Sequence, residues 1–265
     1  MHRLTPWLEV VVARRMQVLV ATDFDGTIAP IVADASRALP DVRAVELLDR
    51  LAQTPGVRVA LLTGRGLEDA AVRLRGLRRA WIGAEHGSVL LDPAGDVTSD
   101  EPVVDVAKLA ALAVRAAEIS LDTPGAWIEP KPGAVALHLR GVPAHAVERL
   151  SERFRAVASV AGARLLEGRS VLEARFRRGD KGTALRALVA DRAAETAVIY
   201  AGDDLTDEAA FAFVRALPHG LAYHVASEER PAATHAHAAL PSQAAWIHVL
   251  GIIVEALHAR TVAAA

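Results

Sequence analysis

Two carboxylates stand one residue apart at the end of an apolar run near the start of the sequence. In the stretch VLVATDFDGTIAP, residues 18–30, Asp23 and Asp25 follow the apolar residues, and Gly26 and Thr27 come directly after them. Neighbouring carboxylates repel one another, so a positive group must lie close to them. Their spacing suits a nucleophile and a proton donor aimed at one phosphate group. Gly26 would let the backbone turn closely around that anion, and Thr27 offers a hydroxyl.

Polar residues suited to the same ligand follow two other apolar runs and precede one helix-like segment. They are Thr63, Gly64 and Arg65 after residues 57–62, Asp180 and Lys181 before residues 182–193, and Asp203, Asp204 and Asp207 after residues 196–202. In an open parallel sheet, ligands bind beyond the carboxyl ends of the strands. With only oxygen ligands on offer, a hard cation such as Mg²⁺ fits best. Lys181 can neutralise the nucleophile and a phosphate together.

Each of these motifs also has a purely structural interpretation. Asp-x-Asp after a strand can form an Asx turn, and Asp203 or Asp204 can cap the helix-like segment 205–214. The run DDLTDE approaches a calcium-binding loop but lacks the glycine required at its sixth place. All four groups occur together, each at a predicted strand end or helix start, and this combination favours one functional site.

The segments that must position these residues alternate between strand-like and helix-like patterns. Strands are predicted at residues 17–22, 57–63, 79–87 and 196–204, and helices at residues 40–53, 66–77, 182–193 and 205–214. Short apolar strands alternating with helices predict an α/β fold with a Rossmann-like core, in which helices cover both faces of a parallel sheet.

Residues 103–178 break this alternation with two helix-strand-strand units. The helices are predicted at residues 103–120 and 143–159, and the strands at residues 126–130, 134–140, 163–168 and 170–176. This order predicts a small antiparallel sheet backed by two helices. We therefore expect a core domain of residues 1–102 and 179–265 and an inserted α+β cap domain of residues 103–178, with hinges at Pro102 and at residues 177–180.

Composition narrows the classes of partner. Apolar residues make up 52% of the 265 residues, and 30 Lys and Arg nearly balance 32 Asp and Glu, for a net charge of −2. This balance argues against nucleic acid or an anionic membrane as the main partner. The sequence has no cysteine, which removes disulfides and thiolate catalysis. Because neither a signal peptide nor a membrane-spanning run is evident, a cytoplasmic protein is predicted, and we expect a monomer.

The motifs resemble those of a known superfamily. DFDGT, TGR, DKG and GDDLTDE are similar to the four signature motifs of the haloacid dehalogenase superfamily of aspartyl-nucleophile phosphatases. GAEHG at 83–87, IEPKPGAVALHLR at 128–140 and LLEGRSVLEAR at 165–175 further resemble its trehalose-6-phosphate phosphatase branch. The resemblance covers roughly residues 17–215, including the inserted domain, and the first fifteen and last fifty residues add nothing to it.

The resemblance implies a role for each core motif. Asp23 would attack phosphorus, and Asp25 would protonate the leaving sugar oxygen and then activate water. Thr63 and Lys181 would bind the phosphate. The phosphate would also lie near Gly26, Thr27, Gly64 and Arg65. Mg²⁺ would be held by Asp23, the backbone carbonyl of Asp25 and Asp203, with support from Asp204 and Asp207.

The inserted domain must then recognise the sugar. Glu129 and Lys131 share one strand face by their spacing, and the resemblance matches them and Glu167 to sugar-binding residues. Alternating polar residues on a sheet with one wet face also need no ligand. Further candidates are His138 and Arg140 on one strand face, His86 as a substrate contact or a loop residue, and Glu173 as a partner of Arg175. Trp81 and Trp127 are predicted as core residues in preference to stacking platforms, although aromatic faces also suit sugars.

The resulting hypothesis is an Mg²⁺-dependent phosphatase acting on trehalose 6-phosphate, a small-molecule substrate. Two alternatives stay open at this point. One is a phosphatase for another sugar phosphate, such as sucrose phosphate or a mannosyl- or glucosyl-glycerate phosphate. The other is a regulatory protein that binds the phosphosugar without turnover. Asp23, Asp25, Lys181 and Asp203 are all present, which favours turnover.

Overall fold

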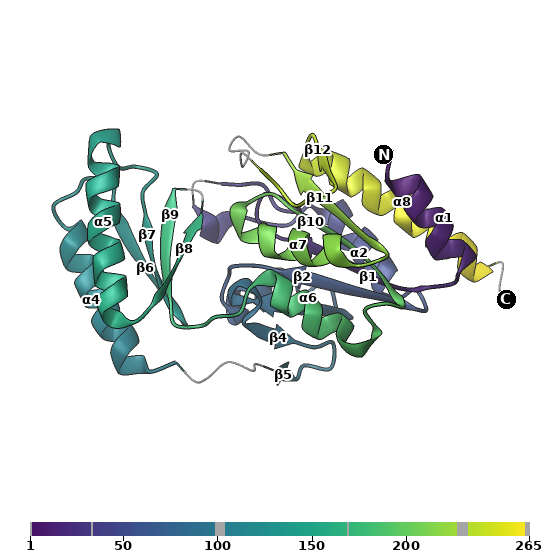
Figure 1. Cartoon of the computed structure of the whole chain (residues 1–265), viewed down its shortest axis with the longest axis horizontal. Coiled ribbons are helices and arrows are strands. Elements are labelled where there is room, and N and C mark those ends of the chain that lie inside the picture. The colour runs from purple at the N-terminus through teal and green to yellow at the C-terminus, as the bar shows by residue number, and fades with distance from the viewer. Residues whose placement is uncertain (1, 33, 99–103, 169, 227–232, 263–265) are drawn as a thin grey trace. The chain divides into compact units, whose positions relative to one another are not determined.

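The computed structural model describes residues 2–32, 34–98, 104–168, 170–226 and 233–262. The chain divides into two compact units, coloured along the sequence in Figure 1: unit 1 comprises Met1–Ser99 and Asp180–Ala265, and unit 2 comprises Asp100–Gly179. Unit 2 is thus inserted into the sequence of unit 1. The predicted hinge at Pro102 lies outside the described residues. Within the described ranges, no helix is both long and apolar enough to span a bilayer.

Unit 1 is built on a sheet that, in the described part of the chain, has eight strands. Their spatial order is β12 (Ala238–Leu240), β11 (Gly220–Val225), β10 (Thr196–Gly202), β1 (Gln17–Asp23), β2 (Val57–Leu62), β3 (Ala80–Ala84), β4 (Val89–Leu91) and β5 (Val97–Thr98). The strands from β12 to β3 run parallel, and β4 and β5 are antiparallel. The central strands are buried on both faces, which explains their unbroken apolar runs.

Helices cover both faces of this sheet (Figure 1). One face packs against α1 (Leu4–Ala13), α2 (Val42–Ala52), α3 (Leu67–Arg73) and α8 (Gln243–Val262), and the other packs against α6 (Lys181–Val189) and α7 (Glu208–Ala216). Short 3₁₀ turns complete the unit: η1 (Ala35–Arg37), η2 (Glu85–Gly87), η3 (Ala190–Arg192) and η4 (Leu205–Asp207). Strand β1 shows the layering, since Val18 and Val20 face the first set of helices and Leu19 and Ala21 the second.

The two ends of the chain, which carry none of the motifs, support the central strand. Helices α1 and α8 lie side by side in Figure 1 and share one apolar core. The indole Nε1 of Trp246 in α8 donates a 3.1 Å hydrogen bond to the Thr22 hydroxyl, which donates in turn to the backbone carbonyl of Asp23. The C-terminal helix is therefore tied to the residue that precedes the first motif.

Among its described residues, unit 2 has a four-stranded antiparallel sheet in the order β6 (Trp127–Lys131), β7 (Ala134–His138), β9 (Val171–Arg175) and β8 (Arg164–Gly168). Helices α4 (Val106–Ser120) and α5 (Ala144–Ala161) both pack on the face that bears Val135, Leu137 and Leu172. The opposite face, called the helix-free face below, bears Trp127, Glu129, Lys131, Ala134, Ala136, His138, Arg164, Leu166, Gly168, Val171, Glu173 and Arg175.

The predicted fold class is confirmed: the core is α/β with a largely parallel sheet, and the insertion is α+β. Some helices differ from the prediction: α6 ends at Val189 and not at residue 193, and α8 was not predicted. Helix α3 ends at Arg73 and not at residue 77, because Gly76 is a poor helix former and the chain turns before it. Helix α1 was not predicted, because its only sequence signal is an apolar face that packs on α8.

Candidate active site

The carboxyl ends of β1 and β10 and the first turn of α6 bring three predicted residues together. Asp23 ends β1, Asp203 follows β10, and Lys181 is the first residue of α6. The Lys181 ammonium donates a 2.6 Å hydrogen bond to Oδ1 of Asp23 and another of 2.6 Å to Oδ1 of Asp207. Asp180 caps the same helix, which fixes the place from which Lys181 extends. The whole Lys181 side chain, its four methylene carbons and its ammonium, is buried.

Asp207 is fully committed to bonds inside the protein. Its Oδ1 accepts from Lys181 and, at 2.5 Å, from the Tyr200 hydroxyl, and its Oδ2 accepts from the backbone N–H groups of Asp203 and Asp204 at 2.9 and 3.0 Å. A carboxylate offers about four lone-pair sites, and here all are used. Asp207 therefore positions Lys181 and the 203–204 backbone, and no lone pair of its carboxylate is left to bind a metal ion.

The electrostatics of this cluster leave room for a cation. One carboxylate oxygen from each of Asp23, Asp203 and Asp207 lies within 4.8 Å of the others. Burial raises the pKa of Asp23 to about 8, although Lys181 opposes the rise, and burial together with the charge of Asp23 raises the pKa of Asp203 to about 9. One ammonium does not balance three buried carboxylates, so the donor set fits a hard divalent cation contacted by Asp23 and Asp203.

Gly26 shapes the same cluster. Its φ is +79°, and a Cβ built on it would lie 2.0 Å from Oδ2 of Asp203. A side chain at this position would force the Asp203 carboxylate out of its place. The glycine of the first motif is therefore required by the backbone conformation and by the close approach of Asp203.

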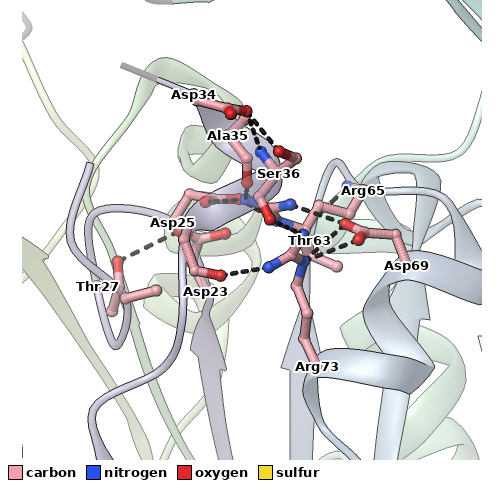
Figure 2. Close-up of polar contacts among 12 residues, drawn as sticks. Asp23, Asp25, Thr27, Asp34, Ala35, Ser36, Thr63, Arg65, Asp69 and Arg73 are labelled. Atoms are coloured by element: carbon pink, nitrogen blue, oxygen red, sulfur yellow. Dashed lines mark hydrogen bonds and ion pairs between the residues drawn. The ribbon is translucent and has the colours of Figure 1, made fainter. Parts of the chain in front are cut away.

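Asp25 is held by the arginine of the second motif. Arg65 donates from Nε and Nη2 to the two oxygens of Asp25, at 2.8 and 2.6 Å, in a fork-on-carboxylate geometry (Figure 2). Its Nη1 donates to Asp69 at 2.7 Å, and its guanidinium lies 5.1 Å from the centre of the Phe24 ring. The pair fixes the direction of the Asp25 carboxylate in this structure.

Asp69 connects this pair to Arg73, so that Asp25, Arg65, Asp69 and Arg73 form one chain of ion pairs, called the Arg65 ladder below. It also accepts two bonds from Nε of Arg73, at 2.8 and 3.0 Å, as Figure 2 shows. Arg73 in turn donates to the backbone carbonyls of Ser36 and Ala38, and Arg65 donates to that of Ala35. The loop that follows the first motif is thereby fastened to helix α3 beside Asp25.

The remaining predicted phosphate contacts lie around the same strand ends. The Thr27 hydroxyl donates to Oδ2 of Asp23 at 3.3 Å, and the Thr63 hydroxyl accepts from the Arg65 N–H at 3.2 Å. The His86 N–H donates to the Thr63 carbonyl, and the imidazole lies so close to Gly64 that a Cβ there would come within 2.5 Å of it. Asp204, by contrast, caps η4 with a 2.6 Å bond from the Leu205 N–H, as its structural interpretation predicted.

Unit 2 gathers a separate charged cluster on its helix-free face. The Lys131 ammonium lies 2.6 Å from Oε2 of Glu173 and 4.0 Å from Oε2 of Glu129. Arg175 contacts the other oxygen of Glu173 at 3.4 Å. Glu173 is therefore central to this cluster, because it faces Ala136 across the strands, and Ala136 faces Glu129. Sequence reasoning assigned Glu173 only to Arg175 and missed its contact with Lys131.

Three other residues of unit 2 lie apart from their predicted places. Glu167 pairs across the strands with Leu172, so it points to the helix side of the sheet, where Arg155 of α5 donates to it at 2.9 Å. The structure does not bring it together with Glu129 and Lys131. Arg140 is exposed beyond the end of β7. Trp127 is 52% exposed, so its prediction as a core residue was wrong, because it lies on edge strand β6 away from the helices.

Comparison with known sequences finds one family and relatives whose names agree with it. The family model described as Trehalose-phosphatase matches residues 21–243. The chain is 38% identical over 232 residues to the trehalose-phosphate phosphatase of Mycobacterium marinum, which covers 84% of this chain and 57% of that protein. It is 31% identical over 210 residues to a bifunctional trehalose-6-phosphate synthase/phosphatase of Thermoproteus tenax, covering 75% of this chain and 27% of that protein.

Solved structures agree at the level of fold. The C-terminal domain of the C. albicans trehalose-6-phosphate phosphatase aligns with a TM-score of 0.80 at 22% identity, covering 96% of this chain and 97% of that one. A trehalose-6-phosphate phosphatase related protein aligns with a TM-score of 0.70 at 26% identity, covering 89% and 97%. The chain spans little more than half the length, 57%, of the first curated relatives that it matches.

Proposed function

Because this chain belongs to the trehalose-phosphatase family, we propose that it hydrolyses trehalose 6-phosphate to trehalose and phosphate, with Mg²⁺ as cofactor. The observation that carries the proposal is the buried contact between Lys181 and Asp23, with Asp203 beside them, at the carboxyl ends of the central strands. This group supplies a carboxylate nucleophile, an ammonium that holds it in place and a second carboxylate beside it, which are the parts needed for nucleophilic attack on phosphorus.

We assign the proton transfers to the first motif. The Asp23 carboxylate forms a bond to phosphorus while the bond from phosphorus to the sugar oxygen breaks, and Asp25 gives its proton to that oxygen. Water then attacks the aspartyl-phosphate, Asp25 takes back a proton, and phosphate leaves with the Asp23 carboxylate restored. In this structure both oxygens of Asp25 accept from Arg65, so Asp25 would have to release one of these bonds in order to carry its proton to the sugar oxygen.

The other core residues are assigned to binding the phosphate and Mg²⁺ and to neutralising their charges. Lys181, Thr63 and the backbone around Gly26 are assigned to the phosphate oxygens, with Thr27, Gly64, Arg65 and His86 around them. Asp23, Asp203 and the backbone carbonyl of Asp25 would hold Mg²⁺, with Asp204 and Asp207 supporting them from behind. When bound, Mg²⁺ supplies Lewis-acid stabilisation of charge on the phosphoryl group.

The sugar is assigned to the helix-free face of unit 2. Carboxylates accept hydrogen bonds from sugar hydroxyls, and an ammonium donates to them. Glu129, Lys131 and Glu173 form such a group, and their mutual ion pairs can be exchanged for hydroxyl contacts. Glu173 takes the third place in this assignment in preference to Glu167, because only Glu173 contacts Lys131.

A phosphate-release assay tests the proposal. The purified chain is given trehalose 6-phosphate, sucrose phosphate, glucosyl-glycerate phosphate, mannosyl-glycerate phosphate and glucose 6-phosphate, each with Mg²⁺ and with excess chelator. We expect the highest kcat/KM on trehalose 6-phosphate, full dependence on Mg²⁺, and a fall in turnover of roughly 10³-fold or more in Asp23→Asn. Binding of trehalose 6-phosphate without release of phosphate would support the regulatory alternative, and a preference for another sugar would reassign the substrate. A cytoplasmic monomer stays a prediction, and sedimentation of the purified chain tests the oligomeric part.

A further inference from the structure

Trp127 is an exposed aromatic side chain in an ordered setting. It is the first residue of β6, an edge strand, and 52% of its surface is accessible. Its indole lies against the imidazole of His138, with ring centroids 3.6 Å apart and planes that differ by 1°. An exposed indole does not contribute the free energy that burying it in the core would give. Its accessible apolar surface can instead contact a ligand.

The Trp127 indole is held in place by His138, which stacks on it and also contacts Glu129. Trp127 and His138 face each other directly across β6 and β7, which places both rings on the helix-free face. The imidazole Nε2 lies 2.9 Å from Oε2 of Glu129. Trp127, His138 and Glu129 therefore form one connected group, and an indole fixed in this way loses little conformational freedom when a ligand covers it.

The chemistry beside the indole is that of a sugar site. Glu129 and Lys131 follow Trp127 on the same face of the strand, at intervals of about 6.6 Å. A pyranose ring carries axial C–H groups on its flat faces and hydroxyls around its rim. A flat apolar plate next to a carboxylate and an ammonium matches both parts of such a ring.

We propose that Trp127 is a substrate-contacting residue that stacks on the flat face of one glucose ring of the substrate, and that His138 is a positioning residue that holds the indole in place. The inference rests on the proposed function and adds a source of specificity to it. The stack favours a second pyranose ring over an acyclic group such as glycerate, which has no flat C–H face.

Kinetics test the stack first. Trp127→Leu keeps an apolar side chain without the ring, and Trp127→Phe keeps a ring. On trehalose 6-phosphate we expect kcat/KM to fall about tenfold in Trp127→Leu, mostly through KM, and much less in Trp127→Phe. The loss on an aryl phosphate should be clearly smaller than the loss on trehalose 6-phosphate. His138→Ala should raise KM, and His138→Phe should recover part of the affinity because it restores a ring beneath the indole.

Fluorescence provides a test that needs no turnover. The chain has four tryptophans, and titration with trehalose should change the emission of the wild type and of Trp81→Phe but not of Trp127→Phe. An unchanged kcat/KM in Trp127→Leu, or an emission change that survives in Trp127→Phe, overturns the inference. If the wild type does not cleave trehalose 6-phosphate, the proposed function fails, and the titration still decides whether Trp127 binds the sugar. If Trp127→Leu does not fold, Trp127→Phe and the titration decide the question.

Discussion

The charged residues of the two units are held in opposite ways. In unit 1, Lys181 is 2% exposed, Asp207 is wholly buried, and each makes several short bonds to groups on different strands and helices. On the helix-free face of unit 2, the side chains of Glu129 and Lys131 are 41% and 21% exposed and pair with neighbours on the same sheet. Burying charge is costly, and it is repaid only when every lone pair and proton finds a partner.

The difference fits the two roles proposed for the units. Attack on phosphorus needs groups that stay in place, because small displacements of the reacting atoms cost large factors in rate. Sugar recognition needs groups that can release one partner and accept a hydroxyl. Substitutions in the unit 1 cluster should therefore affect every phosphate ester, whereas those on the helix-free face should affect only substrates that carry the second sugar.

The largest effect is expected from Asp23→Asn. An amide does not attack phosphorus, so turnover of both trehalose 6-phosphate and an aryl phosphate should fall by roughly 10³-fold or more. Single-turnover phosphate release measures this loss. Binding of trehalose, followed by calorimetry, should persist in this variant. A variant that retained a tenth of the wild-type rate would rule out Asp23 as the nucleophile.

Asp207→Asn should come next. The amide removes one charge from a buried pair and presents N–H groups where Lys181, Tyr200 and two backbone groups donate. We expect a fall of about 3–5 kcal/mol in the free energy of unfolding, with a loss of rate on all substrates. Urea denaturation followed by circular dichroism measures the first quantity. Asp204→Asn is the matched control for the free energy of unfolding alone, since asparagine also caps a helix well and the change should lower that free energy little.

A smaller and selective effect should separate the two glutamates of the β8–β9 hairpin. Glu173→Gln removes the charged partner of Lys131, and we expect kcat/KM on trehalose 6-phosphate to fall by roughly ten- to a hundredfold. Glu167→Gln removes only an exposed pair with Arg155, and its effect should be under about twofold. Steady-state kinetics on the two variants decide between them. The reverse order would return Glu167 to the sugar site and remove Glu173.

A small effect on every substrate is expected from Asp69→Asn. Asp69 bridges Arg65 and Arg73 at a half-exposed position, whereas Arg65 keeps both of its bonds to Asp25. Exposed pairs of this kind contribute little, so we expect a loss of about two- to fivefold in kcat that is equal for both substrates. A loss confined to trehalose 6-phosphate would instead connect the Arg65 ladder to sugar binding.

The fold and the grouping of Asp23, Lys181 and Asp203 were predictable because their signals are local. The alternation of apolar runs with helical patterns gave the α/β class, and each core motif stands at the end of one strand or the start of one helix. The role of Asp207 was not predictable from spacing. It depends on the Tyr200 hydroxyl and on two N–H groups that converge only when η4 forms.

Unit 2 shows what strand spacing leaves open. In β9, Leu172 and Ala174 alternate with Glu173, so its polar face could have been assigned from the sequence alone. In β8 two leucines stand side by side before Glu167, and only its pairing with Leu172 reveals that this glutamate points to the helix side. Trp127 was assigned to the core by its residue type, although its place on an edge strand exposes it.

The division of work between the units can be tested with two variants and two substrates. Asp207→Asn and Glu129→Gln are each assayed for kcat/KM on trehalose 6-phosphate and on an aryl phosphate, beside the wild type. We predict that Asp207→Asn loses the same factor on both substrates. Glu129→Gln should lose roughly ten- to a hundredfold on trehalose 6-phosphate and far less on the aryl phosphate. Equal losses on the two substrates for Glu129→Gln would contradict the assignment of sugar recognition to the helix-free face of unit 2.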